Sequence, residues 1–281
     1  MRIIEGKENG FCFGVQRSIN KTKNLLKDKE LIYALGDLVH NEEVINELKQ
    51  EGLIVVQDLG DVPKNNKVIF RAHGETLENY QKAQERNLEV IDLTCGKVKR
   101  IHRIIQDNNT DNYILIIGKK THPEVIGHTS YAKNYSVIEN ISDISLSKES
   151  FNKSNLKNIY YVVQTTFNSE KFQEILKEVK KVYQDISING VNTICETTIN
   201  RQREVLDIAK KATKVIIVGD KNSSNTKELF NLAKKNNQEV FLILHKKELK
   251  EISLKDSDIV GIIGGASTSI EMINEIKSNL E

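Results

Sequence analysis

Short apolar runs alternate with longer amphipathic stretches along the chain. Runs such as LIYAL, YILII and KVIIV are rich in β-branched and aromatic residues, and each ends at a glycine, which is typical of buried strands. Stretches such as EEVINELKQEG, SEKFQEILKEVKKVY and TKELFNLAKKN place apolar residues at helical spacing. This alternation predicts an α/β protein with mostly parallel sheets and helices on both faces of each sheet.

The pattern of strands and helices occurs three times, and a cysteine marks each occurrence. The three cysteines are Cys12, Cys95 and Cys195. A helical stretch, an apolar strand and a glycine follow each one, and the glycines lie 24, 23 and 24 residues after the cysteines. Four positions after each glycine stands a polar residue, in turn His40, His122 and Ser223.

Each repeat continues to a second strand that also ends in polar residues. These residues are His73 in the first repeat, Thr165 and Thr166 in the second, and Ser267 and Thr268 in the third. A further strand then leads into the next cysteine (LEVIDLTC, ISINGVNTIC), but the third repeat has no strand left. The N-terminal segment RIIEGKENGFC could supply the missing strand.

The repeats predict three similar α/β units, spanning residues 1–95, 96–194 and 195–281. Ligands of open parallel sheets bind beyond the carboxyl ends of the strands, and the polar residues singled out above lie at such ends. An arrangement about a pseudo-threefold axis would bring the cysteines and the polar loops to one central point.

Charge and hydropathy exclude several classes of protein. The chain has 41 Lys and Arg against 39 Asp and Glu, a formal charge of +2, which argues against nucleic-acid binding and against a membrane-surface patch. We find no run of about 18 apolar residues and no apolar core of a signal peptide near the N-terminus. We therefore expect a soluble, cytoplasmic protein.

Three cysteines in a reducing compartment argue against a disulfide framework. Three scattered cysteines are often only small buried hydrophobes, but a shared place at the start of a helix favours thiolates. Zinc would require a fourth ligand, for which a histidine is conceivable. A [4Fe–4S] cluster held by three cysteines would leave one iron open to substrate. The threefold register favours a metal site, and the open position favours iron–sulfur over zinc.

The polar loops indicate an anionic ligand. Ser223, Ser224 and Asn225 precede a predicted helix, where such residues serve either as an N-cap or as an anion site. Because the donors are mostly neutral, a small anion such as a diphosphate is expected, and neither a Walker A loop nor a GxGxxG fingerprint is present. His102, His128 and His245 fall outside the register and are interpreted as structural.

The motifs GFCFGVQRSI, HNEEV, RAHG, DLTC, HPEV, QTT, TIC with NRQ, SSN and GAST together resemble those of the 4-hydroxy-3-methylbut-2-enyl diphosphate reductases, the IspH/LytB family. The resemblance covers nearly the whole chain. It implies reductive removal of a hydroxyl group to give isopentenyl and dimethylallyl diphosphates, the last step of the methylerythritol phosphate pathway. It also implies three α/β domains around a cubane [4Fe–4S] cluster that binds the substrate hydroxyl at its open iron, and a one-electron donor protein such as ferredoxin or flavodoxin.

The resemblance implies a role for each motif residue. The cluster ligands would be Cys12, Cys95 and Cys195. The diphosphate would be bound by His40, His73, Ser223, Ser224, Asn225 and Ser267. Near the reacting end of the substrate would lie His122, Glu124, Thr165, Thr198 and, again, Asn225. Two motifs depart from the usual family pattern, because TCGKV replaces TCPLV and ICETTINRQ replaces ICYATxNRQ; the second departure affects the alignment at Thr198.

Two other functions remain open on the residues alone. One is a quinolinate-synthase-like dehydratase, also built from three units around a three-cysteine cluster, although it would need groups suited to dicarboxylates. The other is a non-catalytic iron–sulfur or zinc sensor, which has no use for six polar loops. For Glu124 the alternatives are a solvated acid in the first turn of a helix and a proton donor kept protonated by burial or by Thr165.

Overall fold

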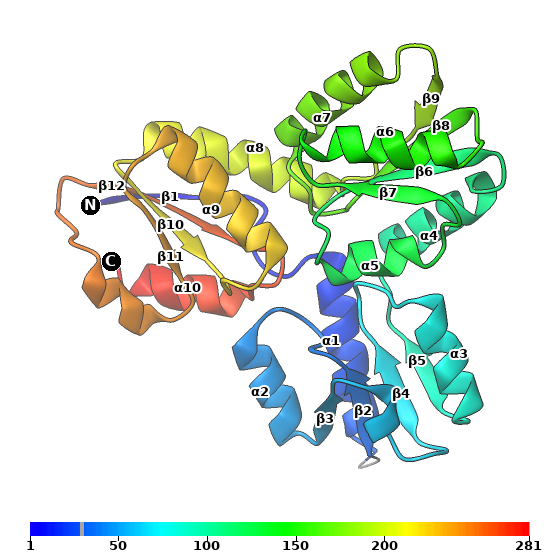
Figure 1. Cartoon of the computed structure of the whole chain (residues 1–281). Coiled ribbons are helices and arrows are strands. Elements are labelled where there is room, and N and C mark those ends of the chain that lie inside the picture. The colour runs from blue at the N-terminus through cyan, green and yellow to red at the C-terminus, as the bar shows by residue number, and fades with distance from the viewer. Residues whose placement is uncertain (29–30, 281) are drawn as a thin grey trace. The chain divides into compact units, whose positions relative to one another are not determined.

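The computed structural model describes residues 1–28 and 31–280. These residues form three four-stranded sheets, in which all described strand pairs are parallel (Figure 1). One sheet has the order β3 (Leu53–Val56), β2 (Ile32–Leu35), β4 (Lys67–Phe70), β5 (Glu89–Asp92). The next has the order β7 (Tyr135–Ile138), β6 (Asn112–Ile117), β8 (Asn158–Val163), β9 (Ser187–Gly190). The third has the order β1 (Arg2–Glu5), β12 (Ile259–Gly264), β10 (Lys214–Val218), β11 (Val240–Ile243). The prediction of three parallel α/β units is confirmed.

Helices connect the strands as the sequence predicts. They are α1 (Phe13–Leu26), α2 (Glu42–Gln50), α3 (Leu77–Glu85), α4 (Gly96–Asn108), α5 (Pro123–Thr129), α6 (Asp143–Lys153), α7 (Ser169–Val182), α8 (Glu196–Lys211), α9 (Ser224–Asn236) and α10 (Ile270–Ser278), with the 3₁₀ turns η1 (Leu59–Asp61) and η2 (Lys246–Glu251). Helix α6 was not predicted. Its sequence DISLSKESFNK is mostly polar, and it buries only Ile144, Ser147 and Phe151. None of the helices in the described part of the chain is both long and apolar enough to cross a membrane.

The chain divides into two compact units. Unit 1 contains residues 1–19, 39–47 and 196–281 and holds the third sheet, while unit 2 contains residues 20–38 and 48–195 and holds the other two. The division into domains at residues 95 and 194 stays a prediction.

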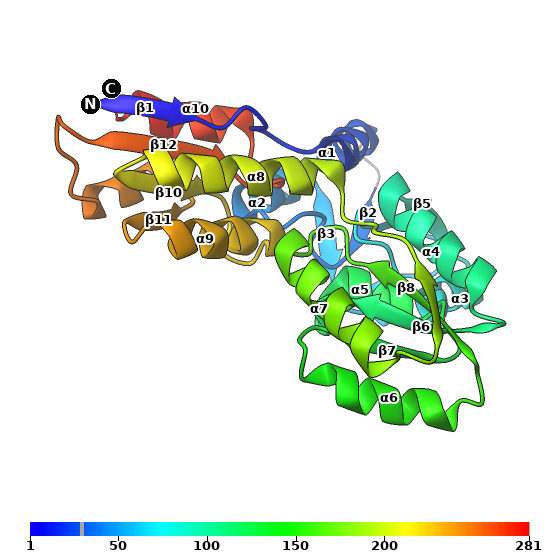
Figure 2. The same ribbon diagram turned by 90° about the horizontal axis from the view of Figure 1, so that it is seen from above.

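The sheet of unit 1 is covered on both faces (Figures 1 and 2). Val215 and Ile217 of β10 pack in one apolar cluster with α8 and α9. The alternate residues Ile216 and Val218 pack in another cluster with α10 and η2. Both faces are buried because successive side chains of a strand point to opposite sides. This explains why β10 reads as a continuous apolar run.

The first strand of the chain completes the sheet of the last repeat. β1 pairs in parallel with β12, and Arg2 lies opposite Ile259 and Glu5 opposite Ile262. The N-terminal segment therefore supplies the strand that the third repeat lacks.

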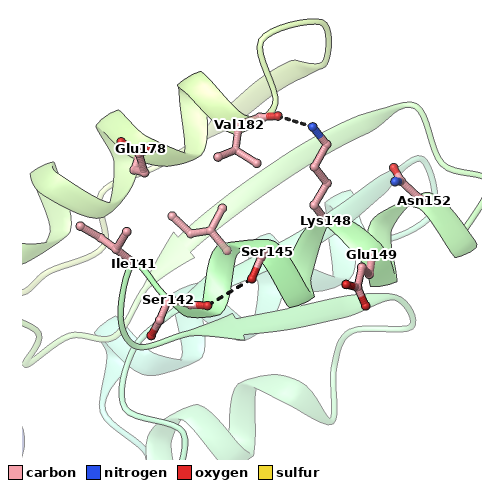
Figure 3. A pocket seen from close by; sticks show the side chains of 9 residues that line it. Ile141, Ser142, Ser145, Lys148, Glu149, Asn152, Glu178 and Val182 are labelled. Atoms are coloured by element: carbon pink, nitrogen blue, oxygen red, sulfur yellow. Dashed lines mark hydrogen bonds between the residues drawn. The ribbon is translucent and has the colours of Figure 1, made fainter.

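The sheet β7-β6-β8-β9 of unit 2 is also a three-layer arrangement, with α4 and α5 on one face and α6 and α7 on the other (Figure 1). A cavity of about 400 Å³ between α6 and α7 is lined by Ile141, Ile144, Lys148, Val182 and neighbouring residues (Figure 3). None of the residues singled out in the sequence lines this cavity. It is therefore separate from the site described next.

Candidate active site

The three cysteines occupy equivalent places in the fold. Each directly precedes a helix, since α1, α4 and α8 begin at the following residue. None of the three is in a disulfide bond, and all are of intermediate exposure. The predicted place at a helix start is thus observed for each of them.

A shared hydrogen bond fixes each cysteine backbone. The N–H of Cys12 donates to the carbonyl of Ala266 at 3.0 Å, that of Cys95 to Ala72 at 3.0 Å and that of Cys195 to Thr165 at 2.9 Å. Each acceptor lies two residues beyond the end of a strand, after β12, β4 and β8 respectively. Three thiols in the same local geometry are what a cluster with three equivalent ligands requires, so the residues present fit an iron–sulfur group.

In unit 1, the polar residues of the third repeat gather at the carboxyl ends of β10 and β12. Ser223 is the N-cap of α9, where its side chain accepts a hydrogen bond from the N–H of Thr226 at 3.4 Å. Ser224 and Asn225 form the first turn of α9. The N-cap interpretation is therefore correct for Ser223, and the same helix end leaves backbone N–H groups available for an anion.

Buried side chains near this helix start have unused hydrogen-bonding groups among the described residues, and besides Thr226 Oγ1 these belong to two residues, Asn225 and Ser267. Asn225 is 3% exposed, and neither Oδ1 nor Nδ2 has a partner among the described residues. Ser267 is 7% exposed, and its Oγ likewise has no partner within residues 1–28 and 31–280. Buried polar groups are nearly always hydrogen-bonded, so these two side chains fit a polar ligand that supplies the missing partners.

Asn41 holds the loop that carries His40. Its Nδ2 donates to the carbonyl of Ser267 at 2.8 Å, and its Oδ1 accepts from the N–H of Val44 at 3.2 Å. His40 is thereby tied, through its neighbour, to the turn that carries Ser267. Thr198, the remaining predicted residue of unit 1, lies buried in the first turn of α8.

Arg201 is a buried residue whose part the sequence did not reveal. It is 2% exposed, and its guanidinium donates to the carbonyl of Gly264 at 2.8 Å and to that of Gly10 at 2.6 Å. These bonds hold the segment before Cys12 against the end of β12. Its place in the motif NRQ was the only signal, because the motif alone does not show that the side chain is buried.

In unit 2, Glu124 and Thr165 are directly hydrogen-bonded. Glu124 lies in the first turn of α5 and is 1% exposed. Its Oε1 accepts from the N–H of Thr165 at 2.7 Å, and its Oε2 accepts from Oγ1 of Thr165 at 2.6 Å. The alternative of a solvated acid at a helix start is thereby excluded, because the carboxyl is buried and bonded to the end of β8.

His128 is a second partner of Glu124. Its Nε2 lies 3.2 Å from Oε1 of Glu124, one helical turn away in α5, and its side chain is fully buried. The interpretation of His128 as structural stays a prediction, to which the structure adds this contact with Glu124. Its position four residues after Glu124 on the same helix was the available signal.

The surroundings of the Glu124 carboxyl affect its pKa, while the interpretation of Glu124 as a proton donor stays a prediction. Burial raises the pKa of the carboxyl, but the hydrogen bond from His128, the charges of His128 and His122, and the Thr165 hydroxyl bring that pKa below its usual value. The donors around Glu124 thus favour its carboxylate form. The sequence alone could not reveal this, because the donors come from separate segments of the chain.

His122 and His73 lie side by side in unit 2. The ring centroids are 5.6 Å apart, and the ring planes are nearly perpendicular. His122 is the N-cap of α5, where its Nδ1 accepts from the N–H of Glu124 at 3.1 Å. This unit thus brings together His73, His122, Glu124 and Thr165, while Cys95 and Cys195 lie directly before α4 and α8.

The chain matches one protein-family model along almost its entire length, namely that of the LytB protein, over residues 3–281. A 4-hydroxy-3-methylbut-2-enyl diphosphate reductase of Petrotoga mobilis is 32% identical over 98% of this chain and 96% of its own. One from Clostridioides difficile is 33% identical over 100% of this chain and 99% of its own. A relative with the same name from Fusobacterium nucleatum is 36% identical, but this chain spans only 34% of its length.

Two solved structures are similar to this one. The E-1-hydroxy-2-methyl-but-2-enyl-4-diphosphate reductase of Plasmodium falciparum has a TM-score of 0.90 at 31% identity, covering 99% of this chain and 87% of that one. A second structure, of an (E)-4-hydroxy-3-methyl-but-2-enyl diphosphate reductase described as the terminal enzyme of the non-mevalonate pathway, has a TM-score of 0.70 at 31% identity and covers 100% of this chain and 99% of that one.

Proposed function

Because the chain belongs to the LytB protein family, we propose that it reduces 4-hydroxy-3-methylbut-2-enyl diphosphate to isopentenyl and dimethylallyl diphosphates. The reaction consumes two electrons and two protons and releases the hydroxyl group as water. The observation that carries the proposal is the equivalent setting of the three cysteines, each fixed by the same hydrogen bond beyond a strand end. Neither of the other candidate functions is a reductase, as the relatives of this chain are.

Cys12, Cys95 and Cys195 would hold a [4Fe–4S] cluster. When bound, the cluster supplies one-electron reduction and a Lewis-acidic iron that lacks a cysteine ligand. The electrons would come from a small donor protein such as ferredoxin or flavodoxin. The three thiols are the only cysteines of the chain, so no further cysteine is available to close the fourth corner.

The diphosphate would be bound at the start of α9. Ser223, Ser224 and Asn225 lie where backbone N–H groups and the positive end of the helix dipole favour an anion. Asn225 and Ser267 would satisfy their unused polar groups on the phosphate oxygens. His40 and His73 would add donors, and Thr198 would line the same pocket.

Glu124 would deliver the proton that lets the hydroxyl leave as water. Thr165 orients the Glu124 carboxylate by hydrogen bonds to both carboxylate oxygens. His122 fixes the backbone of Glu124 by accepting a hydrogen bond from its N–H. A hydroxide is a poor leaving group until it is protonated, so a positioned acid contributes about 10²–10⁴-fold. Glu124 must take up a proton before it can act as this acid, since its pKa is lowered.

Anaerobic purification followed by turnover tests the proposal. We expect a brown protein with about four irons per chain that converts 4-hydroxy-3-methylbut-2-enyl diphosphate when a reduced one-electron donor is supplied. A colourless zinc protein would refute the redox function. An iron–sulfur protein without turnover of this substrate would refute the assignment of the substrate.

A further inference from the structure

We propose that His128 is the proton-holding partner of Glu124, so that the two side chains share one exchangeable proton. The proton passes from Nε2 of His128 to Oε1 of Glu124, and from Glu124 to the hydroxyl of the substrate. The inference rests on the proposed function, and it gives a part in the reaction to a histidine that the repeat pattern leaves out.

The geometry of the pair is fixed by one helix. Glu124 and His128 lie one turn apart on α5, and Nε2 is 3.2 Å from Oε1. Their side chains are 2% and 0% exposed respectively. Solvent therefore does not reach the carboxylate directly, and any proton that Glu124 takes up has to come through a neighbouring side chain.

His128 is the one titratable side chain that contacts the carboxyl of Glu124 among the hydrogen bonds described above. The other two bonds come from the backbone N–H and the hydroxyl of Thr165, and neither group is acidic enough to give up its proton to a carboxylate. A buried carboxylate is also costly unless a positive charge or donor accompanies it. His128 supplies the neighbouring side chain that can hold a proton and pass it to Glu124.

The groups around the pair do not replace His128 in this part. His102 of α4 meets the ring of His128 edge to face, with centroids 5.1 Å apart, and stacks on Tyr131. Burial, followed by the charge of His128, lowers the pKa of His102 to about 3. His102 is therefore neutral at the pH of catalysis and carries no proton to donate.

The charged residues that lie next in this region are already paired with each other. Arg71 lies 3.2 Å from Glu75, and Lys99 lies 2.6 Å from Asp92. His122 uses its Nδ1 as an acceptor from the backbone of Glu124. The carboxylate of Glu124 thus has the imidazole of His128 as its hydrogen-bonding neighbour on α5.

The transfer balances with the proposed reaction. The N–H bond at Nε2 of His128 breaks as an O–H bond of Glu124 forms, and that O–H bond breaks in turn as the hydroxyl of the substrate gains the proton, its C–O bond breaks and water leaves. The two electrons come from the donor of the proposed function. The pair takes up one proton from water before the next turnover.

The test compares His128→Gln with the wild type. Gln keeps a donor to Glu124 but cannot hold a transferable proton. We expect kcat to fall at least about tenfold, as part of the ~10²–10⁴-fold effect of a positioned acid, with iron content and KM within about twofold. In the double variant with Glu124→Gln, kcat should be no lower than in Glu124→Gln alone, because both changes interrupt one transfer.

A matched control is His245→Gln. His245 also contacts a glutamate, with Nδ1 2.6 Å from Oε1 of Glu43, but both side chains are partly exposed. We expect wild-type kcat for this variant, since exposed pairs contribute little. If His128→Gln and His245→Gln both turn over at the wild-type rate, the inference is wrong; if the wild type itself has no turnover, the proposed function fails instead.

If His128→Gln does not fold, spectra of the wild type and of Glu124→Gln, recorded without substrate, test the inference instead. Infrared spectra report the protonated carboxyl of Glu124, and ¹⁵N spectra report the protonation state of the imidazole of His128. At one pH, Glu124→Gln should change the imidazole signal of His128, because the proposal places one shared proton between the two side chains. An unchanged imidazole signal would overturn the shared proton.

Discussion

Asn225 should destabilise the ligand-free protein and stabilise the bound one. Both polar atoms of its side chain are buried without a partner among the described residues, and an unsatisfied buried group costs about 1–3 kcal/mol. Asn225→Leu keeps the approximate volume and removes both groups. We therefore expect the free energy of unfolding without ligand to rise by about 1 kcal/mol or more.

The same substitution should weaken anion binding. If Asn225 makes hydrogen bonds to a phosphate, their loss costs at least about 1.4 kcal/mol, or about tenfold in Kd. Urea denaturation of the variant and the wild type, with and without inorganic diphosphate, measures both effects. Diphosphate should stabilise the wild type more than the variant at equal concentration.

Asn237, at the other end of α9, supplies the matched control. Its Nδ2 donates to the carbonyls of Ala209 and Ala212 at 3.2 and 2.8 Å, and its Oδ1 accepts from the N–H of Glu239 at 2.8 Å. Asn237→Leu should therefore lower the free energy of unfolding by about 1–3 kcal/mol without changing the stabilisation by diphosphate. The reasoning is refuted if Asn225→Leu destabilises the ligand-free protein as Asn237→Leu does, or if it leaves diphosphate binding unchanged.

Three further predictions concern the site. Cys95→Ser should lose most of the iron and the turnover, measured by iron analysis and activity; full iron content would contradict the three-ligand site. Glu124→Gln should reduce turnover about 10²–10⁴-fold with cluster content unchanged, and turnover within about twofold of the wild type would remove its role as acid. Arg201→Leu should lower the free energy of unfolding by about 2–4 kcal/mol, because two carbonyls lose a charged donor. The control Arg203→Leu, on the exposed face of α8, should change the free energy of unfolding little. Equal effects of the two substitutions would contradict the role given to Arg201.

Most of the fold could be predicted from the sequence because each repeat has local hydrophobic patterns that are typical of strands and helices. Strands such as β6 and β10 are continuous apolar runs, and the helices between them are amphipathic. Helix α6 could not be predicted in this way because few of its residues are apolar. Its place is set by packing of Phe151 against Tyr113 and Tyr183, which are distant in the sequence.

The candidate site was predictable as a set of residues but not as a set of contacts. The repeat register located the cysteines and the polar loops, because equivalent strand ends recur at equal spacing. The ionisation of Glu124 depends on donors from α5 and from the end of β8, and the hydrogen bonds of Arg201 join residues up to 191 positions apart. Such contacts follow from the folded structure alone.

The pairing of β1 with β12 has a consequence for how the protein is made. Strand β1 is made long before its partner β12, since the two can pair only after residues 259–264 have been synthesised, and the backbone N–H of Cys12 donates to Ala266. Domains generally fold in the order of their synthesis, but here Cys12 gains this hydrogen bond only after β12 has been made. A nascent chain therefore cannot assemble all three cysteine positions before residue 266 has been made, which ties loading of a cofactor to the synthesis of the third sheet.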